Sequence, residues 1–295
     1  MKRPRATRIH TVEGTFRDPN FALHVARNPE HTSTQVHKHT FHELVVIMKG
    51  TGKHSMDNRT YRMEAGDVFV ITGDMVHAYD VPGTFSLINI LFDPRRLGLP
   101  LKDLRRLPGY HALFDVEPRM RRRHNFESRL RLPMDELGHL AGMVAEMEEE
   151  LTLREPGYRF MATTHLMHII GYLSRCYTKM QLPKARPVMR ISEVLSYMEH
   201  HYDAPLTLED LTKVAHMSQT SLMRTFREVM GRSPIDYLIR LRVSKASQLL
   251  ASGDVRVTEA ALQVGFSDSN YFSRQFRKVM GIPPREYARK ARMKV

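Results

Sequence analysis

The stretch LMRTFREVMG at residues 222–231 recurs fifty positions later as FSRQFRKVMG at residues 272–281. Matches at the same offset continue past both copies, so the similarity extends beyond one short motif. An internal repeat of this kind indicates two copies of one structural unit. The matched pairs are Arg224 and Arg274, Phe226 and Phe276, Arg227 and Arg277, Gly231 and Gly281, Pro234 and Pro284, and Tyr237 and Tyr287.

Each unit is predicted to be two short helices joined by a tight turn, over about 207–231 and 257–281. Thr207 followed three positions later by Asp210 is typical of a helix start, and Gly265 allows the turn in the second unit. Apolar residues four apart in the second helix of each unit should anchor that helix in the core. They are Leu222, Phe226, Phe272 and Phe276.

The opposite face of each second helix mixes polar side chains that can read base edges with arginines that can reach guanine or phosphate. An ordinary solvated helix is the alternative, but the same mixture in two matched units favours DNA recognition. The candidate DNA-binding residues on this face are Gln219, Thr220, Met223, Arg224, Arg227, Ser269, Asn270, Ser273, Arg274 and Arg277.

One long helix should join the two units, because Ser233 can cap it, Pro234 suits its first position and Gly253 follows its end. A helix of about 18 residues is roughly 27 Å long. It could hold two recognition helices about 34 Å apart, one turn of the duplex.

Residues 260–287 closely resemble the signature of the AraC/XylS family of transcription regulators, and the resemblance covers about the last 105 residues. It implies that Thr220, Met223 and Arg224 lie nearest the DNA, together with Asn270, Tyr271 and Arg274. It also implies double-stranded promoter DNA and RNA polymerase as partners.

The composition agrees with a polyanionic partner. The 295 residues carry a formal net charge of +13, and residues 186–295 hold 18 Lys plus Arg against 11 Asp plus Glu. Basic density is therefore higher in the last third of the chain, although a solvated basic face is the simpler explanation. A single cysteine excludes a disulfide scaffold, and we expect neither a secretion signal nor a membrane-spanning segment. We expect a cytoplasmic protein without a membrane partner.

The first 94 residues contain short runs rich in Val, Ile, Phe and Tyr, separated by turn residues, which predicts an antiparallel sandwich or barrel. Residues 134–154 and 160–177 then have helical periodicity and flank a Pro-Gly turn, which predicts a helical hairpin. Phe160 and Met161 belong to its expected apolar stripe, and the hairpin could support a homodimer. A Pro-containing stretch at 181–187 is predicted as the linker.

A second group of polar residues lies in the strand region. Period-two alternation puts His37, His39, Phe41 and Glu43 on one face of an extended segment, and His77 comes from a later strand. Imidazoles with a carboxylate suit Zn, Fe, Mn or Ni. A sugar or acid bound without metal, or purely structural histidines, remain open alternatives, and no cofactor is required.

This group resembles the first cupin motif, while Thr72, Asp74 and Val81 depart from the second. That resemblance implies His37, His39, Glu43 and His77 as metal ligands, and it leaves a metal-dependent cupin enzyme as an alternative function. Within the AraC/XylS family, residues 42–54, 67–79 and 104–114 are similar to the rhamnose-responsive activators, which implies a sugar effector. A regulator that responds to a non-sugar small molecule is a further alternative, as is an architectural DNA-compacting protein.

The sequence therefore predicts an α+β multidomain protein. Residues 1–133 form an N-terminal arm and a cupin-like β-barrel that senses a ligand, and residues 134–180 form the hairpin. After the linker, residues 188–295 form an all-α DNA-binding domain of two helix-turn-helix units. The predicted function is a ligand-responsive transcription regulator of a carbohydrate-utilisation operon, with activation expected from the family.

Overall fold

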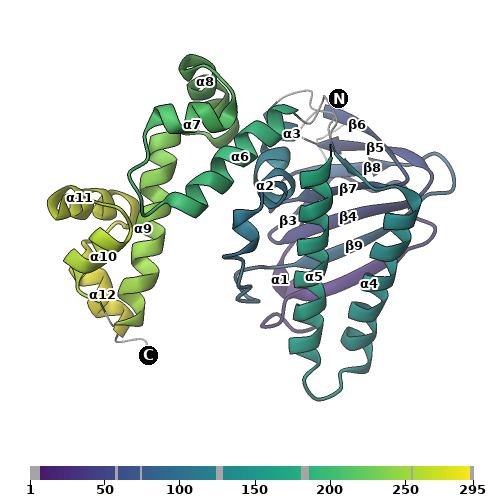
Figure 1. Ribbon diagram of the computed structural model, residues 1–295. Coiled ribbons are helices and arrows are strands. Elements are labelled where there is room, and N and C mark those ends of the chain that lie inside the picture. The colour runs from purple at the N-terminus through teal and green to yellow at the C-terminus, as the bar shows by residue number, and fades with distance from the viewer. Residues whose placement is uncertain are drawn as a thin grey trace, which may run out of the picture. The chain divides into compact units, whose positions relative to one another are not determined.

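The computed structural model describes residues 7–56, 59–73, 75–123, 129–180, 186–253 and 255–292 (Figure 1). The chain forms two compact units, Met1–Ser192 and Glu193–Val295. Most of the predicted linker, residues 181–185, lies outside the described residues, as does Asp74. Arg186 and Pro187 belong to helix α6 (Arg186–His201).

Two five-stranded sheets make up most of the first unit (Figure 1). Neighbouring strands are antiparallel, except that β1 runs parallel to β3. No pairing between the described strands joins one sheet to the other, so the predicted cupin-like domain consists of two sheets and not of a closed barrel. In spatial order, the first sheet contains β1 (Arg8–His10), β3 (His37–His39), β8 (His77–Asp80), β5 (Thr51–Met56) and β6 (Arg59–Glu64), and the second contains β10 (Leu130–Arg131), β7 (Asp67–Ile71), β4 (His42–Lys49), β9 (Ser86–Phe92) and β2 (Leu23–Asn28).

The central strands of the second sheet, β4 and β7, are buried on both faces. Their sequences contain the runs LVVI and VFVI, whose residues are all fully buried. An uninterrupted apolar run is what a strand covered on both sides requires. One face packs toward the first sheet in a shared core that includes Ile47, Phe69, Met63 and Tyr79, and the helices α4 and α5 lie across the other (Figure 1).

The predicted hairpin is formed by α4 (Met134–Leu153) and α5 (Tyr158–Lys179), with Gly157 at φ +91° in the turn. An ion pair between Arg27 on β2 and Glu148 on α4 connects it to the second sheet. The prediction that the apolar stripe of the second hairpin helix is core is wrong at the start of α5, because Phe160 and Met161 are 75% and 41% exposed. The residues of α5 that are buried are Ala162, Leu166, Ile169, Ile170, Leu173, Ser174 and Tyr177.

Short helical segments lead into and out of the strand region. A single turn, α1 (Val12–Thr15), follows β1. After β9, the chain forms the 3₁₀ turn η1 (Leu104–Arg106), α2 (Pro108–His111), the π-helical turn η2 (Ala112–Val116) and α3 (Glu117–Arg123). The α2 segment packs against α5 at Gly109, where a β-carbon would lie 1.9 Å from the carbonyl oxygen of Ser174.

The second unit is entirely helical among its described residues and contains both predicted helix-turn-helix pairs. Its 19-residue helix α9 lies between them, as Ser233, Pro234 and Gly253 predicted. No helix in the described parts of the chain is both long and apolar enough to cross a membrane. After α6, the helices are α7 (Leu208–Ala215), α8 (Gln219–Met230), α9 (Pro234–Ser252), α10 (Val257–Gln263), α11 (Ser269–Met280) and α12 (Pro284–Arg292).

Side-chain caps set the starts of these helices. The Thr207 hydroxyl accepts the backbone N–H of Asp210, whose carboxylate in turn accepts the N–H of Thr207, which confirms the predicted capping box. Ser218 caps α8, and Asp268 caps α11 by accepting two backbone N–H groups. The predicted anchors Leu222, Phe226, Phe272 and Phe276 are all fully buried.

Candidate functional site

The polar group predicted in the strand region comes from three strands. His37 and His39 lie on β3, His77 lies beside them on β8, and Glu43 lies on β4 of the other sheet. The prediction of one extended segment from His37 to Glu43 is wrong, because β3 ends at His39 and β4 begins at His42. The chain changes sheets between them, and this turn brings Glu43 back toward the imidazoles.

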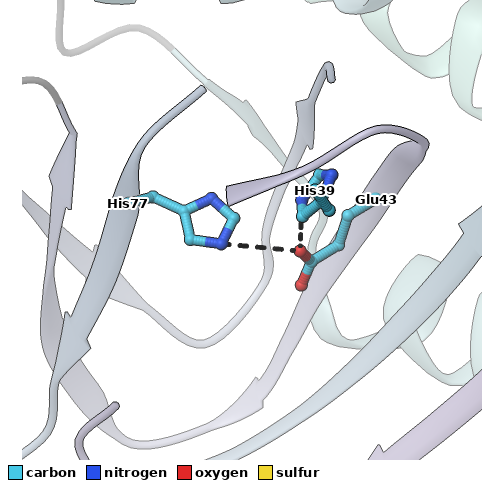
Figure 2. A group of neighbouring side chains, drawn as sticks. All are labelled: His39, Glu43 and His77. Atoms are coloured by element: carbon cyan, nitrogen blue, oxygen red, sulfur yellow. Dashed lines mark hydrogen bonds and ion pairs between the residues drawn. The ribbon is translucent and has the colours of Figure 1, made fainter. Parts of the chain in front are cut away.

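The side chains of His39, Glu43 and His77 converge inside this unit (Figure 2). Glu43 Oε2 lies 3.0 Å from His39 Nε2 and 3.8 Å from His77 Nε2. His37 adjoins the group, with its Nε2 2.7 Å from Nε2 of His77. His39, Glu43 and His77 are buried, so three of the four predicted metal ligands form one enclosed cluster and the fourth touches it.

Backbone carbonyls fix two of the imidazole rings. Nδ1 of His39 lies 2.7 Å from the carbonyl oxygen of Phe41, and Nδ1 of His37 lies 2.9 Å from that of Gln35. A carbonyl oxygen can only accept, so we assign the hydrogen to Nδ1 in both rings. In the neutral form of each ring, Nε2 then presents a lone pair to the cluster.

Phe41, also predicted at the site, has two roles. Its ring stacks on His39 with centroids 4.6 Å apart and an interplanar angle of 11°. It also belongs to a small buried cluster with Val12, Phe16 and Ala22. Phe41 therefore supports one face of the His39 ring and connects it to the segment that follows β1.

Three residues that the motif did not include extend the cluster. His54 on β5 pairs with Tyr79 on β8 in the strand register, and their rings stack 4.9 Å apart. The rings of His31 and Tyr79 form a T-shaped pair with their centroids 5.2 Å apart. The sequence contained a signal for Tyr79, because alternation from His77 places it on the same strand face.

Burial sets the ionisation of this extended group. It holds the pKa of His54 and of His77 well below the usual histidine range, and the positive charge of Arg121 lowers the pKa of His54 further. Burial also raises the pKa of Tyr79 well above its ordinary value, and the nearby Glu43 carboxylate adds to this shift. Nδ1 of His77 and Nε2 of His54 are buried and have no hydrogen-bond partner among the described residues. Buried polar atoms without partners are costly unless something else satisfies them.

The candidate DNA-binding residues lie on the outer faces of α8 and α11. Most are exposed, while Met223 and Ser273 are half-buried and the Ser273 hydroxyl donates to the carbonyl of Ser269. Met223, Arg224, Arg227 and Glu228 line a shallow cleft of about 380 Å³ on α8. The exposed set is Gln219, Thr220, Arg224, Arg227, Ser269, Asn270, Tyr271, Arg274 and Arg277.

Burial of the opposite faces explains why these side chains point outward. Leu222 and Phe226 fix the rotation of α8, and Phe272 and Phe276 do the same for α11. The guanidinium of Arg274 lies 5.9 Å from the ring centre of Tyr271, which orients it along the exposed face. The two helices thus display equivalent polar surfaces.

Known families match both parts of the chain. Residues 18–170 match the AraC-like ligand-binding domain and residues 211–290 match a helix-turn-helix domain. The HTH-type transcriptional activator RhaR of Escherichia coli strain K12 is 27% identical over 252 residues, covering 85% of this chain and 86% of that protein. RhaR of Salmonella arizonae is 27% identical over 274 residues, covering 92% and 93%.

A solved structure resembles part of the chain. A probable AraC family transcriptional regulator from Rhodopseudomonas palustris is 33% identical, covering 35% of this chain and 96% of that one, with a TM-score of 0.33. The matched relatives are transcription regulators and not enzymes. The match to the ligand-binding domain spans more than half of the sequence. The chain therefore belongs to the AraC family of ligand-responsive transcription regulators, with a ligand-binding domain followed by a DNA-binding helix-turn-helix region.

Proposed function

We propose that this regulator activates a carbohydrate-utilisation operon and that a small sugar binds inside the strand domain. The observation that carries the proposal is the buried polar group around Glu43, in which His77 Nδ1 and His54 Nε2 have no partner among the described residues. Carboxylate and imidazole groups can hydrogen-bond the hydroxyls of a sugar, and aromatic rings suit its apolar faces. The effector would contact His37, His39, Phe41, Glu43 and His77.

The choice of a sugar rests on the resemblance of residues 42–54, 67–79 and 104–114 to the rhamnose-responsive activators. A non-sugar effector is the competing proposal, because the same polar atoms could hold an organic acid. The proposed function does not require a metal, although the same donors suit Zn, Mn, Fe or Ni.

We further propose that α8 and α11 enter neighbouring major grooves of a promoter site. The support is the exposure of matched side chains on both helices and the 19-residue helix between the two units. Arg224 and Arg274 are proposed to read bases, and Arg227 and Arg277 to contact phosphates. We also propose that the protein contacts RNA polymerase and acts in the cytoplasm, as a promoter-binding role requires.

The functional division along the chain is proposed to follow the predicted boundaries, with a sensor at 1–133, a hairpin at 134–180, a linker at 181–187 and a DNA-binding domain at 188–295. A homodimer through the hairpin is part of this proposal. The exposed side chains of Phe160, Met161 and Leu153 support it, since a second hairpin would remove their apolar surface from water.

A titration of the protein against its own upstream DNA tests the proposed function. Fluorescence anisotropy would be measured with and without a panel of sugars, including L-rhamnose, and a parallel panel of organic acids. A sugar effector should change DNA affinity by roughly 5- to 150-fold, the usual range of allosteric coupling.

The matched variants are Tyr79→Phe and His24→Ala. Tyr79→Phe removes a hydroxyl beside Glu43 and should weaken the response to sugar while basal DNA binding persists. His24 is exposed on β2, so His24→Ala should respond normally. If only organic acids changed DNA affinity, the effector would belong to that class and not to the sugars. If Tyr79→Phe responded as the wild type does, the effector would not bind beside Tyr79.

A further inference from the structure

We propose that the pocket between α12 and the start of α10 binds phosphate groups, and that their source is the DNA backbone beside the groove that α11 enters. The pocket lies in the second unit, and its described lining residues belong to neither α8 nor α11. It would therefore be a DNA contact additional to the base-reading faces. It depends on the proposed function only for the source of the phosphates.

Four arginines surround this pocket, which has a volume of about 540 Å³. Arg256 directly precedes α10, while Arg285, Arg289 and Arg292 follow one face of α12 at helical spacing. All four are exposed. Among the described residues the rest of the lining is uncharged, and it consists of Val255, Val257, Thr258 and Ala288.

The acidic side chains close to the pocket do not neutralise this charge. Glu259 on α10 accepts a hydrogen bond from within its own helix. Glu286 on α12 lies 2.8 Å from Lys290, and Lys290 lowers the pKa of Glu286 more than Arg289 does. Asp254 lies outside the described residues, and one further carboxylate would still leave the arginines in excess. The pocket is therefore strongly positive.

The internal repeat shows that the fold does not require these arginines. Helices α9 and α12 follow the two recognition helices, and each begins at a matched proline. Where α12 has Arg285 and Arg289, α9 has Ile235 and Ile239. An exposed helix face needs polar residues, but converging charges of one sign repel one another. The excess of one sign on α12 therefore points to an anionic ligand.

The guanidinium groups select the class of anion. Each guanidinium presents a planar fork of N–H donors that matches two oxygens of one phosphate. Arg292 uses one of its donors on the carbonyl of Gly253 at 2.8 Å, which holds this side chain beside the end of α9. The pocket is within the usual size range for ligand sites, and it has room for more than one phosphate. Neighbouring phosphates along a chain fit it better than a lone carboxylate does.

The place of the pocket in the helix-turn-helix favours DNA as the source of these phosphates. In such motifs the second helix enters the major groove and the first helix crosses the backbone. Helix α10 is the first helix of the second unit, and Arg256 and Thr258 at its start line the pocket. With α11 in a major groove, the arginines of α12 would neutralise phosphates next to that groove.

The test compares the full-length wild type with the double variant Arg285→Gln, Arg289→Gln. Arg292 is kept because it binds the Gly253 carbonyl. Anisotropy titrations use a duplex without promoter sequence at several salt concentrations. At 0.1 M salt the double variant should bind roughly tenfold more weakly, and the slope of the logarithm of the binding constant against the logarithm of salt concentration should fall by about two.

Two further variants separate a phosphate site from a general loss of charge. The double variant Lys213→Gln, Lys290→Gln removes two exposed charges from the same unit outside the pocket, so it should change the slope much less. The variant Arg285→Lys, Arg289→Lys keeps both charges and should restore most of the slope. Circular dichroism checks that each variant folds.

Ethylation interference on the upstream DNA locates the contact. In the wild type, ethylation of one or two phosphates beside the α11 half-site should block binding, and in Arg285→Gln, Arg289→Gln these phosphates should become insensitive. The base contacts should not change. Losing them in Arg224→Ala and Arg274→Ala is a separate result that tests the proposed function, because the unrelated duplex contains no promoter site.

Calorimetric titration with pyrophosphate, in the absence of DNA, distinguishes the two sources of phosphate. If pyrophosphate binds the wild type more than tenfold better than Arg285→Gln, Arg289→Gln while the DNA results are unchanged, the ligand is a free polyphosphate and not the backbone. The phosphate site itself is overturned if that variant binds DNA as the lysine-to-glutamine control does and pyrophosphate does not distinguish it from the wild type.

Discussion

Gly265 lies so close to Asp203 that a β-carbon at Gly265 would be 2.8 Å from the Asp203 carbonyl oxygen. Gly265 also has φ +86°, in the left-handed region that glycine adopts readily. It forms the turn between α10 and α11, whereas Asp203 follows the end of α6. The turn of the second helix-turn-helix therefore packs directly against the backbone that follows α6.

Gly265→Ala should destabilise the DNA-binding unit more than Gly281→Ala does. Gly281 has nearly the same φ, +80°, but a β-carbon there meets nothing within 4 Å. Gly281→Ala should cost about 1 to 2 kcal/mol, the left-handed penalty alone. Gly265→Ala adds a collision with backbone that cannot rotate away, so its loss should be clearly larger. Denaturant unfolding measures both, and equal losses would show that the contact with Asp203 is unimportant.

Lys245→Met should destabilise the same unit by about 3 to 5 kcal/mol. Lys245 Nζ on α9 lies 2.8 Å from Glu199 Oε2 on α6, and the two side chains are only 15% and 2% exposed. Removing the cation takes the charge of Lys245 away from a buried carboxylate. The double variant Glu199→Met with Lys245→Met should regain much of the loss, because neither charge then remains buried.

The control for that ion pair is Lys213→Ala. Lys213 pairs with Glu209, but these side chains are 69% and 75% exposed, and exposed pairs contribute about 0 to 1 kcal/mol. Unfolding free energies from urea titrations should therefore separate the two positions. A similar small loss at Lys245 would mean that water reaches Glu199 readily.

The helix-turn-helix units were predictable because their signals are local. Caps such as Thr207, the turn glycine Gly265 and apolar anchors four residues apart each act within a few residues, and the repeat presents each signal twice. The sensor site depends on contacts between strands. Alternation runs unbroken from His37 to Glu43, yet nothing in that pattern shows that the chain changes sheets between His39 and His42.

Two further differences between the sequence predictions and the structure also come from tertiary contacts. His54 becomes part of the site only because β5 pairs with β8 and places it opposite Tyr79, a register that a single sequence does not reveal. Phe160 fits the helical stripe, but α5 continues past the surface available to cover it. Periodicity reports which face of a helix is apolar, and tertiary packing decides how much of that face is buried.

Asp115→Asn should lower stability near neutral pH and have little effect in acid. Asp115 Oδ2 lies 2.8 Å from Nδ1 of His111. Burial alone would raise the Asp115 pKa, but the hydrogen bond and charge of His111, with Arg119 and Arg105, lower it from 3.8 to about 2. Because the folded state holds the ionised carboxylate more tightly than the unfolded state does, the lowered pKa stabilises the fold by about 2 kcal/mol above pH 4. That stabilisation is lost as the pH falls from about 3.8 to 2.

Unfolding titrations of wild type and Asp115→Asn between pH 7 and pH 3 measure this difference. The gap between the two proteins should be constant above pH 5 and narrow below pH 4. Asp103→Asn, at an exposed position in the same region, is the control and should track the wild type. A gap that does not change with pH would mean that the substitution acts through packing and not through charge.

Arg224→Ala and Arg274→Ala should each weaken binding to the promoter site by about 1 to 3 kcal/mol, because each removes a side chain proposed to read a base. Binding to unrelated DNA should fall less, so the ratio of specific to non-specific affinity should drop. Arg227→Ala and Arg277→Ala should weaken binding to specific and to unrelated DNA alike. Each should also reduce the slope of the logarithm of the binding constant against the logarithm of salt concentration by about one, since each removes about one phosphate contact. Lys290→Ala is the control, since Lys290 is paired with Glu286 on its own helix. Anisotropy titrations at several salt concentrations distinguish these cases, and unchanged specificity in both Arg224→Ala and Arg274→Ala would remove α8 and α11 as the base-reading helices.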